Sequence, residues 1–275
     1  MQESELEYRE MMASGAGADL VRCVWHLRGR GEGDAPQPIV SDGCVEIVIN
    51  LAEPFEQLLE DGRTVRQPLA MVVGPTARPT FVRPTGRIEV LGIRLQPWAA
   101  AKVLRHAMSD LRDRIVPLDD VVCGALRELP EQLADGKSLG ARLDRAMCGV
   151  ADAGAKPIAE ISRQAVELIP RAADAQTVRE LAHRLGRSVR TIQRVFSDEV
   201  GLPPKTLLRI IRVQRSLALA LSTNLRWTTI AARAGYHDQS HFVRDFRSLV
   251  GCTPTEFRPE IDSLTASFVD ARVSS

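Results

Sequence analysis

The chain has 275 residues, of which 44% are hydrophobic and 26% are charged, which is enough for two domains with separate cores. Its formal net charge of +1 hides an asymmetry, because residues 1–170 carry 20 Lys and Arg against 25 Asp and Glu, whereas residues 171–260 carry 15 against 8. This distribution is typical of a nucleic-acid-binding region joined to one that binds something else, and no apolar run approaches the roughly 20 residues that span a bilayer.

The N-terminus is acidic and polar, the opposite of a secretory signal peptide. The cysteines are odd in number and never spaced as Cys-x-x-Cys: Cys23, Cys44, Cys123, Cys148 and Cys252. We therefore expect free thiols in a cytoplasmic protein, with a redox-sensing pair as the alternative.

The pattern of residues 20–95 indicates β structure. Alternating or continuously apolar stretches predict strands at residues 20–27, 44–51, 69–74 and 88–95. Turn signals such as Ser41-Asp-Gly43 and Gly74-Pro75 separate them. Several short strands at this spacing predict a small barrel or sandwich.

This β-rich region offers no catalytic constellation. Only His26 and His106 precede residue 171, without a His-x-His spacing, so neither a metal centre nor another cofactor is expected. The sequence also lacks a Gly-rich phosphate loop and a nucleophile elbow. We therefore do not expect an enzyme.

A barrel without catalytic groups can still hold a ligand at its mouth, where aromatic and a few polar side chains orient it. The candidates for such an effector pocket are Trp25, Cys44, Glu46, Arg94 and Trp98. Core packing is the alternative role for each of them.

Helical periodicity follows in residues 97–170. It predicts helices at residues 98–106, 118–134, 139–151 and 157–169. Their apolar faces need a partner, which is either the barrel or a second subunit of a homodimer.

Residues 177–196 predict two short helices joined by a tight turn. Apolar residues at positions 178, 181, 182 and 185 form one face of the first helix, with Thr177 as N-cap, Glu180 as its capping-box partner and Gly186 as the C-terminal break. Ser188 caps the second helix. This arrangement is a helix-turn-helix.

The outward stripe of the second helix carries Arg190, Gln193 and Arg194. Arg forks onto guanine and Gln onto adenine in the major groove, so these are the predicted base-reading residues. A solvated helix face is the alternative.

The same pattern returns after 49 to 50 residues, because the spacing from Ala182 to Gly186 recurs from Ala231 to Gly235 and the helix exits repeat as well. Composition alone does not produce such a period, so we predict a tandem pair of helix-turn-helix units. The base-reading candidates of the second unit are Gln239, Ser240, His241 and Arg244.

Residues 204–222 predict one unbroken helix between the two units, with Pro204 in its first turn. A helix of this length is a stiff spacer. The residues expected to contact DNA phosphates are Ser188, Lys205, Arg209 and Arg215.

A larger set of residues in this region forms a signature: Ala182, Gly186, Ser188, Arg190, Gln193, Arg194, Phe196, Gly201, Pro204, Arg212, Ile230, Ala231, Gly235, Tyr236, Asp238, Ser240, His241, Phe242, Arg244, Phe246, Gly251, Thr253, Pro254, Phe257 and Arg258. With it, residues 171–258 resemble the C-terminal DNA-binding domain of AraC/XylS-type transcription regulators. The departures are Tyr236, where Phe is usual, and Leu202-Pro203 in place of a small-polar-Pro turn. The resemblance implies a seven-helix domain that places one helix of each unit in successive major grooves of double-stranded DNA. It also implies an activator with RNA polymerase as a partner.

Three motifs of the β-rich region, at residues 40–50, 73–76 and 91–97, resemble the cupin-like sensor domain that often precedes such DNA-binding domains. We therefore expect an α+β protein: an N-terminal β-rich cupin-like barrel with a helical extension, followed by an all-α domain of two helix-turn-helix units joined by a long helix. The expected boundaries are 1–115 for the sensor domain, 116–170 for the extension, 171–258 for the DNA-binding domain and 259–275 for a flexible tail.

The expected function is sequence-specific transcription regulation controlled by an unidentified small-molecule effector. The alternative is a DNA-binding regulator whose N-terminal domain serves only dimerisation or partner docking.

Overall fold

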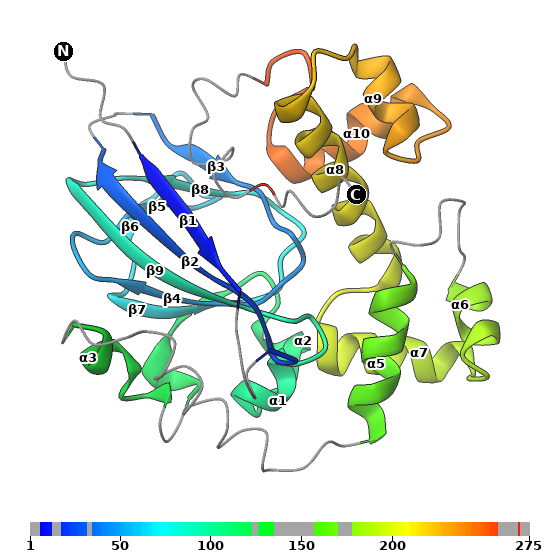
Figure 1. Cartoon of the computed structure of the whole chain (residues 1–275), viewed down its shortest axis with the longest axis horizontal. Coiled ribbons are helices and arrows are strands. Elements are labelled where there is room, and N and C mark those ends of the chain that lie inside the picture. The colour runs from blue at the N-terminus through cyan, green and yellow to red at the C-terminus, as the bar shows by residue number, and fades with distance from the viewer. Residues whose placement is uncertain are drawn as a thin grey trace.

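The structure is a computed structural model, and it describes residues 6–12, 18–31, 35–122, 126–134, 157–169, 178–257 and 269. Figure 1 shows the strands gathered on one side of the molecule and helices α5 to α10 along the other. The predicted helix at residues 139–151, the N-cap Thr177 and almost all of the predicted tail lie outside the described residues.

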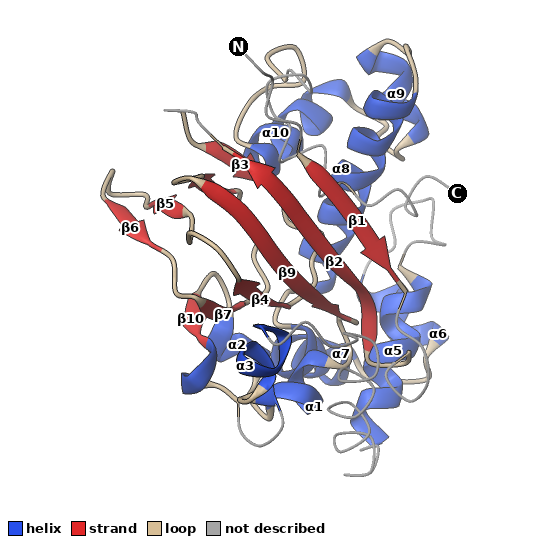
Figure 2. Ribbon diagram, turned by 60° about the vertical axis from the view of Figure 1, so that its left-hand side comes forward, coloured by secondary structure: helices blue, strands red, loops and turns tan. Residues whose placement is uncertain are grey.

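The N-terminal region is built on two antiparallel sheets, which Figure 2 shows in red. The six-stranded sheet has the order β1 (Glu7–Met11), β2 (Val21–Arg30), β9 (Arg87–Leu95), β4 (Glu46–Asn50), β7 (Ala70–Val73) and β10 (Ile115–Pro117). The four-stranded sheet has the order β3 (Gln37–Ile39), β8 (Thr80–Arg83), β5 (Glu56–Leu58) and β6 (Thr64–Arg66).

The predicted α+β fold and its β-rich N-terminal region are confirmed, and the four predicted strands correspond to β2, β4, β7 and β9. The sequence missed the shorter or more exposed strands. β1 is polar and β6 is fully exposed, so neither carries the apolar alternation on which the prediction rested.

Strand β4 explains how the layers pack, because both of its faces are covered. Ile47 and Ile49 belong to an apolar core that the sheet shares with the helices below it, whereas Val48 belongs to the core on the opposite face, toward the second sheet. The pleat sends alternate side chains to opposite faces, which produces these two cores from one strand.

The helices below the sheet are α1 (Ala100–Leu104), α2 (Met108–Leu111), the 3₁₀ turn η2 (Leu118–Asp120) and α3 (Leu129–Ala134). The prediction of one helix over residues 118–134 was wrong, because η2 ends where Val121 takes φ −127° and leaves the helical region. The helix predicted at 98–106 is shorter, since Arg105 adopts left-handed φ 56°.

The C-terminal region is helical, with α5 (Pro157–Leu168), α6 (Val178–Arg184), α7 (Val189–Val195), α8 (Pro204–Ser222), α9 (Trp227–Arg233) and α10 (Gln239–Val250). A π-helical turn, η4 (Phe196–Val200), extends α7. The predicted long helix is confirmed by the 19 residues of α8. No helix in the described part of the chain is both long and apolar enough to cross a membrane.

The β-rich region packs directly on both halves of the helical region. Val40 shares an apolar core with residues of α8 and α10, and the Arg112 guanidinium donates to the carbonyl of Gly201. Gln214 of α8 is buried, and its amide donates to the carbonyl of Ser41 at 2.9 Å. Trp98 packs against both the sheet–helix core and the core around α6 and α7.

Candidate functional site

The first helix-turn-helix unit is formed by α6 and α7. Gly186 adopts φ +60°, a left-handed conformation that favours glycine at a helix C-terminus. The N–H of Arg187 reaches back to the carbonyl of Ala182 at 2.8 Å, and the Ser188 hydroxyl accepts from the N–H of Thr191 at 3.1 Å. The predicted turn and N-cap are therefore confirmed.

The second unit, formed by α9 and α10, repeats the glycine turn of the first, with one more residue between the glycine and the N-cap of the following helix. Gly235 has φ +86°, and the N–H of Tyr236 donates to the carbonyl of Ala231 at 3.0 Å, the counterpart of the Arg187 bond. The carboxylate of Asp238 caps α10 by accepting two backbone N–H groups in its first turn. The sequence repeat is thus also a repeat of backbone geometry.

The two units bury matching apolar faces and end in matching glycines. Gly201 has φ +80° and Gly251 has φ +95°. Residues that face inward are Ile192, Val195, Phe196, Phe242, Phe246, Leu249 and Val250.

The predicted base-reading side chains are all exposed on the outer faces of α7 and α10: Arg190, Gln193, Arg194, Gln239, Ser240, His241 and Arg244. Exposure is what groove contact requires, and it leaves their role in base reading a prediction.

The expected phosphate contacts have mixed surroundings. Lys205 is exposed in the first turn of α8, whereas Ser188 is engaged as the cap of α7. Arg215 is half-buried, and Arg209 pairs with Asp245 of α10 at 2.7 Å.

Asp245 is a structural residue that the sequence did not reveal. It is 3% exposed, although it lies on a helix that carries predicted DNA contacts. Besides Arg209, its carboxylate contacts the hydroxyl of Tyr236 and the imidazole of His241, each at 3.4 Å. The Arg209–Asp245 pair therefore connects α10 to α8 and constrains the orientation of α10.

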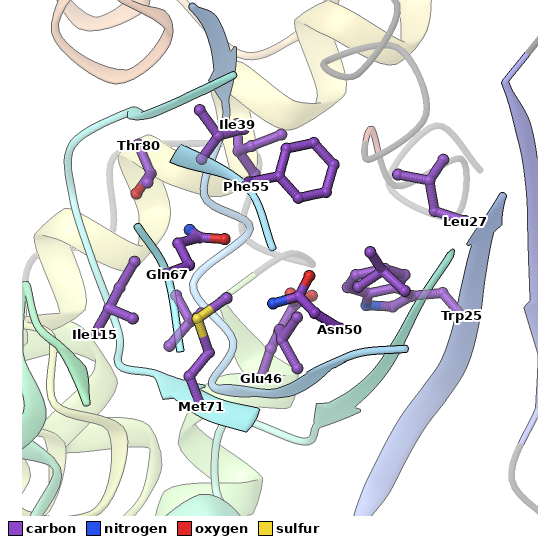
Figure 3. Close-up of a pocket in the computed structure, with 14 residues that line it drawn as sticks. Trp25, Leu27, Ile39, Glu46, Asn50, Phe55, Gln67, Met71, Thr80 and Ile115 are labelled. Atoms are coloured by element: carbon purple, nitrogen blue, oxygen red, sulfur yellow. The ribbon is translucent and has the colours of Figure 1, made fainter. Parts of the chain in front are cut away.

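A second candidate site is a cavity between the two sheets that is partly open to solvent. Figure 3 shows side chains from several strands pointing into it. Its lining residues are Trp25, Leu27, Ile39, Glu46, Val48, Asn50, Phe55, Gln67, Met71, Val73, Thr80, Val82, Val90 and Ile115.

Two of the five predicted pocket residues, Trp25 and Glu46, line this cavity. Arg94 lies behind Glu46, Cys44 contacts Arg22, and Trp98 packs among the helices. Of the lining residues that the sequence analysis missed, Asn50 was within reach, because it follows Glu46 by an even number of positions and shares its face of β4.

The Trp25 indole lines the cavity because its cross-strand neighbour is a glycine. Trp25 pairs with Gly92 in the β2–β9 register, and a Cβ at Gly92 would lie 1.9 Å from the indole ring. A side chain at Gly92 would force the ring out of this position.

An ionic cluster centred on the buried Arg94 adjoins the cavity through Glu46. The Arg94 guanidinium is 2.7 Å from Glu46, 3.0 Å from Asp42 and 3.4 Å from Glu10. Burial raises the pKa of Glu46, and the charge of Arg94 opposes this rise only in part. Burial also acts to raise the pKa of Asp42, but Arg94 and Arg22 outweigh it and hold that pKa below its usual value.

No group of three or more His, Cys, Asp or Glu in the described part of the chain is arranged to hold a metal ion.

Comparisons with known proteins agree with the two regions. Residues 181–260 match a family described as a helix-turn-helix domain, and residues 9–117 match a domain of unknown function, DUF6597. A tandem helix-turn-helix unit of this kind defines a DNA-binding module. The C-terminal region is a helix-turn-helix domain of the AraC type.

The F1 operon positive regulatory protein of Yersinia pestis is 37% identical over 73 residues, 26% of this chain and 24% of that protein. The HTH-type transcriptional regulator Rv1931c of Mycobacterium tuberculosis is 36% identical over 88 residues, 32% of this chain and 34% of that protein. The chain therefore spans about a quarter to a third of the length of these relatives.

Among solved structures, ToxT from Vibrio cholerae aligns over 93% of this chain and 97% of its own, with a TM-score of 0.48 and 9% identity. A second ToxT structure, described as bound to an unsaturated fatty acid, aligns over 93% of this chain and 96% of its own, with a TM-score of 0.43 and 10% identity.

Proposed function

We propose that this protein is a sequence-specific transcription regulator, acting as an activator, whose two helix-turn-helix units read adjacent major-groove segments. The observation that carries the proposal is the repetition of one turn geometry in two units with unlike exposed side chains, held by a single helix. The names of the relatives support the activator role, and RNA polymerase is the partner that this role requires.

The exposed residues are chemically suited to base reading. Arg190 and Arg194 offer forked donors for guanine, and Gln193 offers the donor and acceptor pair that matches adenine. Arg244 and Gln239 offer a second such set. Lys205 and backbone N–H groups at helix starts supply contacts to phosphates, which position the protein without reading sequence.

The spacing of the two readers follows from α8. A helix of 19 residues extends about 28 Å and does not bend freely. Reading helices held in this way suit half-elements about one helical turn, or 10 base pairs, apart. Because the two exposed sets differ, the half-elements should differ in sequence and not form a palindrome.

We further propose that the N-terminal region controls DNA binding through a small-molecule effector in the cavity. A chain of contacts supports this: Glu46 lines the cavity and pairs with Arg94, Arg94 pairs with Asp42, and the adjoining Ser41 carbonyl accepts the Gln214 amide of α8. A ligand that displaces Glu46 would disturb the turn at Asp42, and with it the hydrogen bond between Ser41 and Gln214 that holds α8.

The alternative is an N-terminal region that serves only dimerisation or partner docking. That role does not need a cavity with a polar residue, Asn50, at its wall, and the cavity therefore favours effector control.

Selection of binding sites from random DNA by the full chain tests the DNA-binding proposal. We expect a bipartite, non-palindromic site, with base preference lost in one half in Arg194→Ala and in the other half in Arg244→Ala. Arg163→Ala, which removes a half-exposed arginine from α5, is the control and should leave the preference intact. Failure to enrich any sequence, or equal losses on selected and random DNA, would contradict base reading.

A further inference from the structure

The polar groups that strand β4 presents to the cavity are hydrogen-bond acceptors. Glu46 and Asn50 lie on the cavity face of the strand, separated by Val48, while Ile47 and Ile49 face the opposite core. The wall around them is largely apolar, so a bound molecule would meet an apolar surface with a polar spot.

Asn50 is 5% exposed, and its side-chain nitrogen donates to the Pro68 carbonyl at 3.0 Å. That bond fixes the orientation of the amide, because only the nitrogen can donate to a carbonyl. Its Oδ1 atom then has no hydrogen-bond partner within the described residues, and Figure 3 shows it on the cavity side. A buried acceptor left in this way is costly until a donor reaches it.

Glu46 adds negative charge to the same wall. Its partner Arg94 also lies within 4.0 Å of Asp42 and Glu10, and Arg22 is a second cation near Asp42, so two guanidiniums face three carboxylates. Of the described residues that line the cavity, none is a lysine, arginine or histidine. The cavity is thus poorly suited to an anionic head group, which would lie beside Glu46 without a cation of its own.

We propose that the cavity binds a compact apolar molecule whose head group is a hydrogen-bond donor, an ammonium in preference to a hydroxyl, and that it rejects carboxylic acids of the same shape. The head group donates to Asn50 Oδ1 and Glu46, and the apolar body lies against Trp25 and Phe55. This inference rests on the proposed role of the cavity as the effector site.

A matched trio of probes tests the class of ligand on the full chain: phenethylamine, phenethyl alcohol and phenylacetic acid, measured by titration calorimetry and by the shift in melting temperature. We expect the amine to bind about tenfold or more tightly than the acid, with the alcohol between them, since a hydrogen bond to a charged group is worth about that factor. The inference is overturned if the acid binds as tightly as the amine or if none of the three binds.

Asn50→Leu tests the residue, and Asn224→Leu is the matched control, because Asn224 is the other asparagine of the chain and lies exposed beyond α8. Asn50→Leu should lower the affinity for the amine and for the alcohol by roughly tenfold, and Asn224→Leu should leave both affinities unchanged. Equal affinity in the two variants would remove Asn50 from the site. The wild-type order of the trio decides the class of ligand even where Asn50→Leu folds poorly.

Measuring DNA affinity in parallel separates this inference from the proposed function. If the amine binds but DNA affinity does not change, the ligand class stands and the effector role fails. If the acid binds best and alters DNA affinity, effector control stands and the donor inference fails.

Discussion

Replacing Gly201 by alanine should destabilise the protein well beyond the usual cost of a left-handed alanine. Gly201 ends the first unit at φ +80°, and an added Cβ would lie 2.4 Å from Pro75 Cγ and 2.9 Å from both the Cβ and the backbone oxygen of Met108. Pro75 and Met108 belong to the N-terminal region, so the methyl group would press the two regions apart.

Gly186→Ala provides the matched control, because Gly186 has φ +60° and open space where its Cβ would stand. The left-handed conformation costs either alanine roughly 1–2 kcal/mol. Overpacking against atoms that cannot move freely adds about 1–3 kcal/mol at Gly201 alone. At about 2–4 °C per kcal/mol for chains of this size, Gly201→Ala should melt several degrees below Gly186→Ala in scanning calorimetry of the full chain. Equal melting temperatures would refute the contact between the regions at Gly201.

Three other predictions concern the Gln214 hydrogen bond, contact with DNA and the burial of Cys23. Gln214→Leu removes the donor to the Ser41 carbonyl, and we expect it to lower the free energy of unfolding by about 1–3 kcal/mol in denaturant titrations. Gln164→Leu at an exposed position is the control and should change that free energy by no more than about 0.5 kcal/mol. Arg194→Ala should lose about 1–3 kcal/mol of binding free energy on the selected site and relax the base preference nearby. Lys205→Ala should lower the affinity for selected and random DNA about equally. Binding assays at fixed salt concentration measure both effects. Burial raises the pKa of Cys23 to about 11, so site-resolved thiol labelling at neutral pH should modify the half-exposed Cys252 well before Cys23.

Each of these outcomes can fail in a distinct way. Equal unfolding energies for the Gln214 and Gln164 variants would make the bond to Ser41 irrelevant to stability. Uniform losses for Arg194→Ala would make it a phosphate contact, and rapid labelling of Cys23 would contradict its burial.

The repeat in the helical region could be predicted from the sequence because local signals specify it. Left-handed glycines, an N-cap serine and apolar faces at helical spacing act within a few residues of one another, so Gly186 and Gly235 identify their turns without knowledge of the rest of the fold. The long helix α8 was equally accessible, since Pro204 begins it and apolar periodicity runs to its end.

What the sequence did not reveal depends on contacts between distant segments. From the sequence, Asp245 resembles an exposed helix residue, because its partners Arg209 and Tyr236 lie beside it only in the folded chain. The cavity likewise needs two sheets to form, so Arg94 could not be placed behind Glu46 instead of in the lining, although the shared face of Glu46 and Asn50 was accessible from the strand pattern.

The central claim is that one chain reads two unlike half-elements at a fixed spacing. Footprinting and affinity measurement with the full chain, on a selected site and on the same site carrying five extra base pairs between its halves, test it most directly. That insertion turns one half by about half a helical turn, so a rigid α8 can no longer place both readers. We predict that affinity falls to about that of random DNA and that protection is lost over at least one half. Unchanged affinity with both halves still protected would contradict the rigid pair of readers.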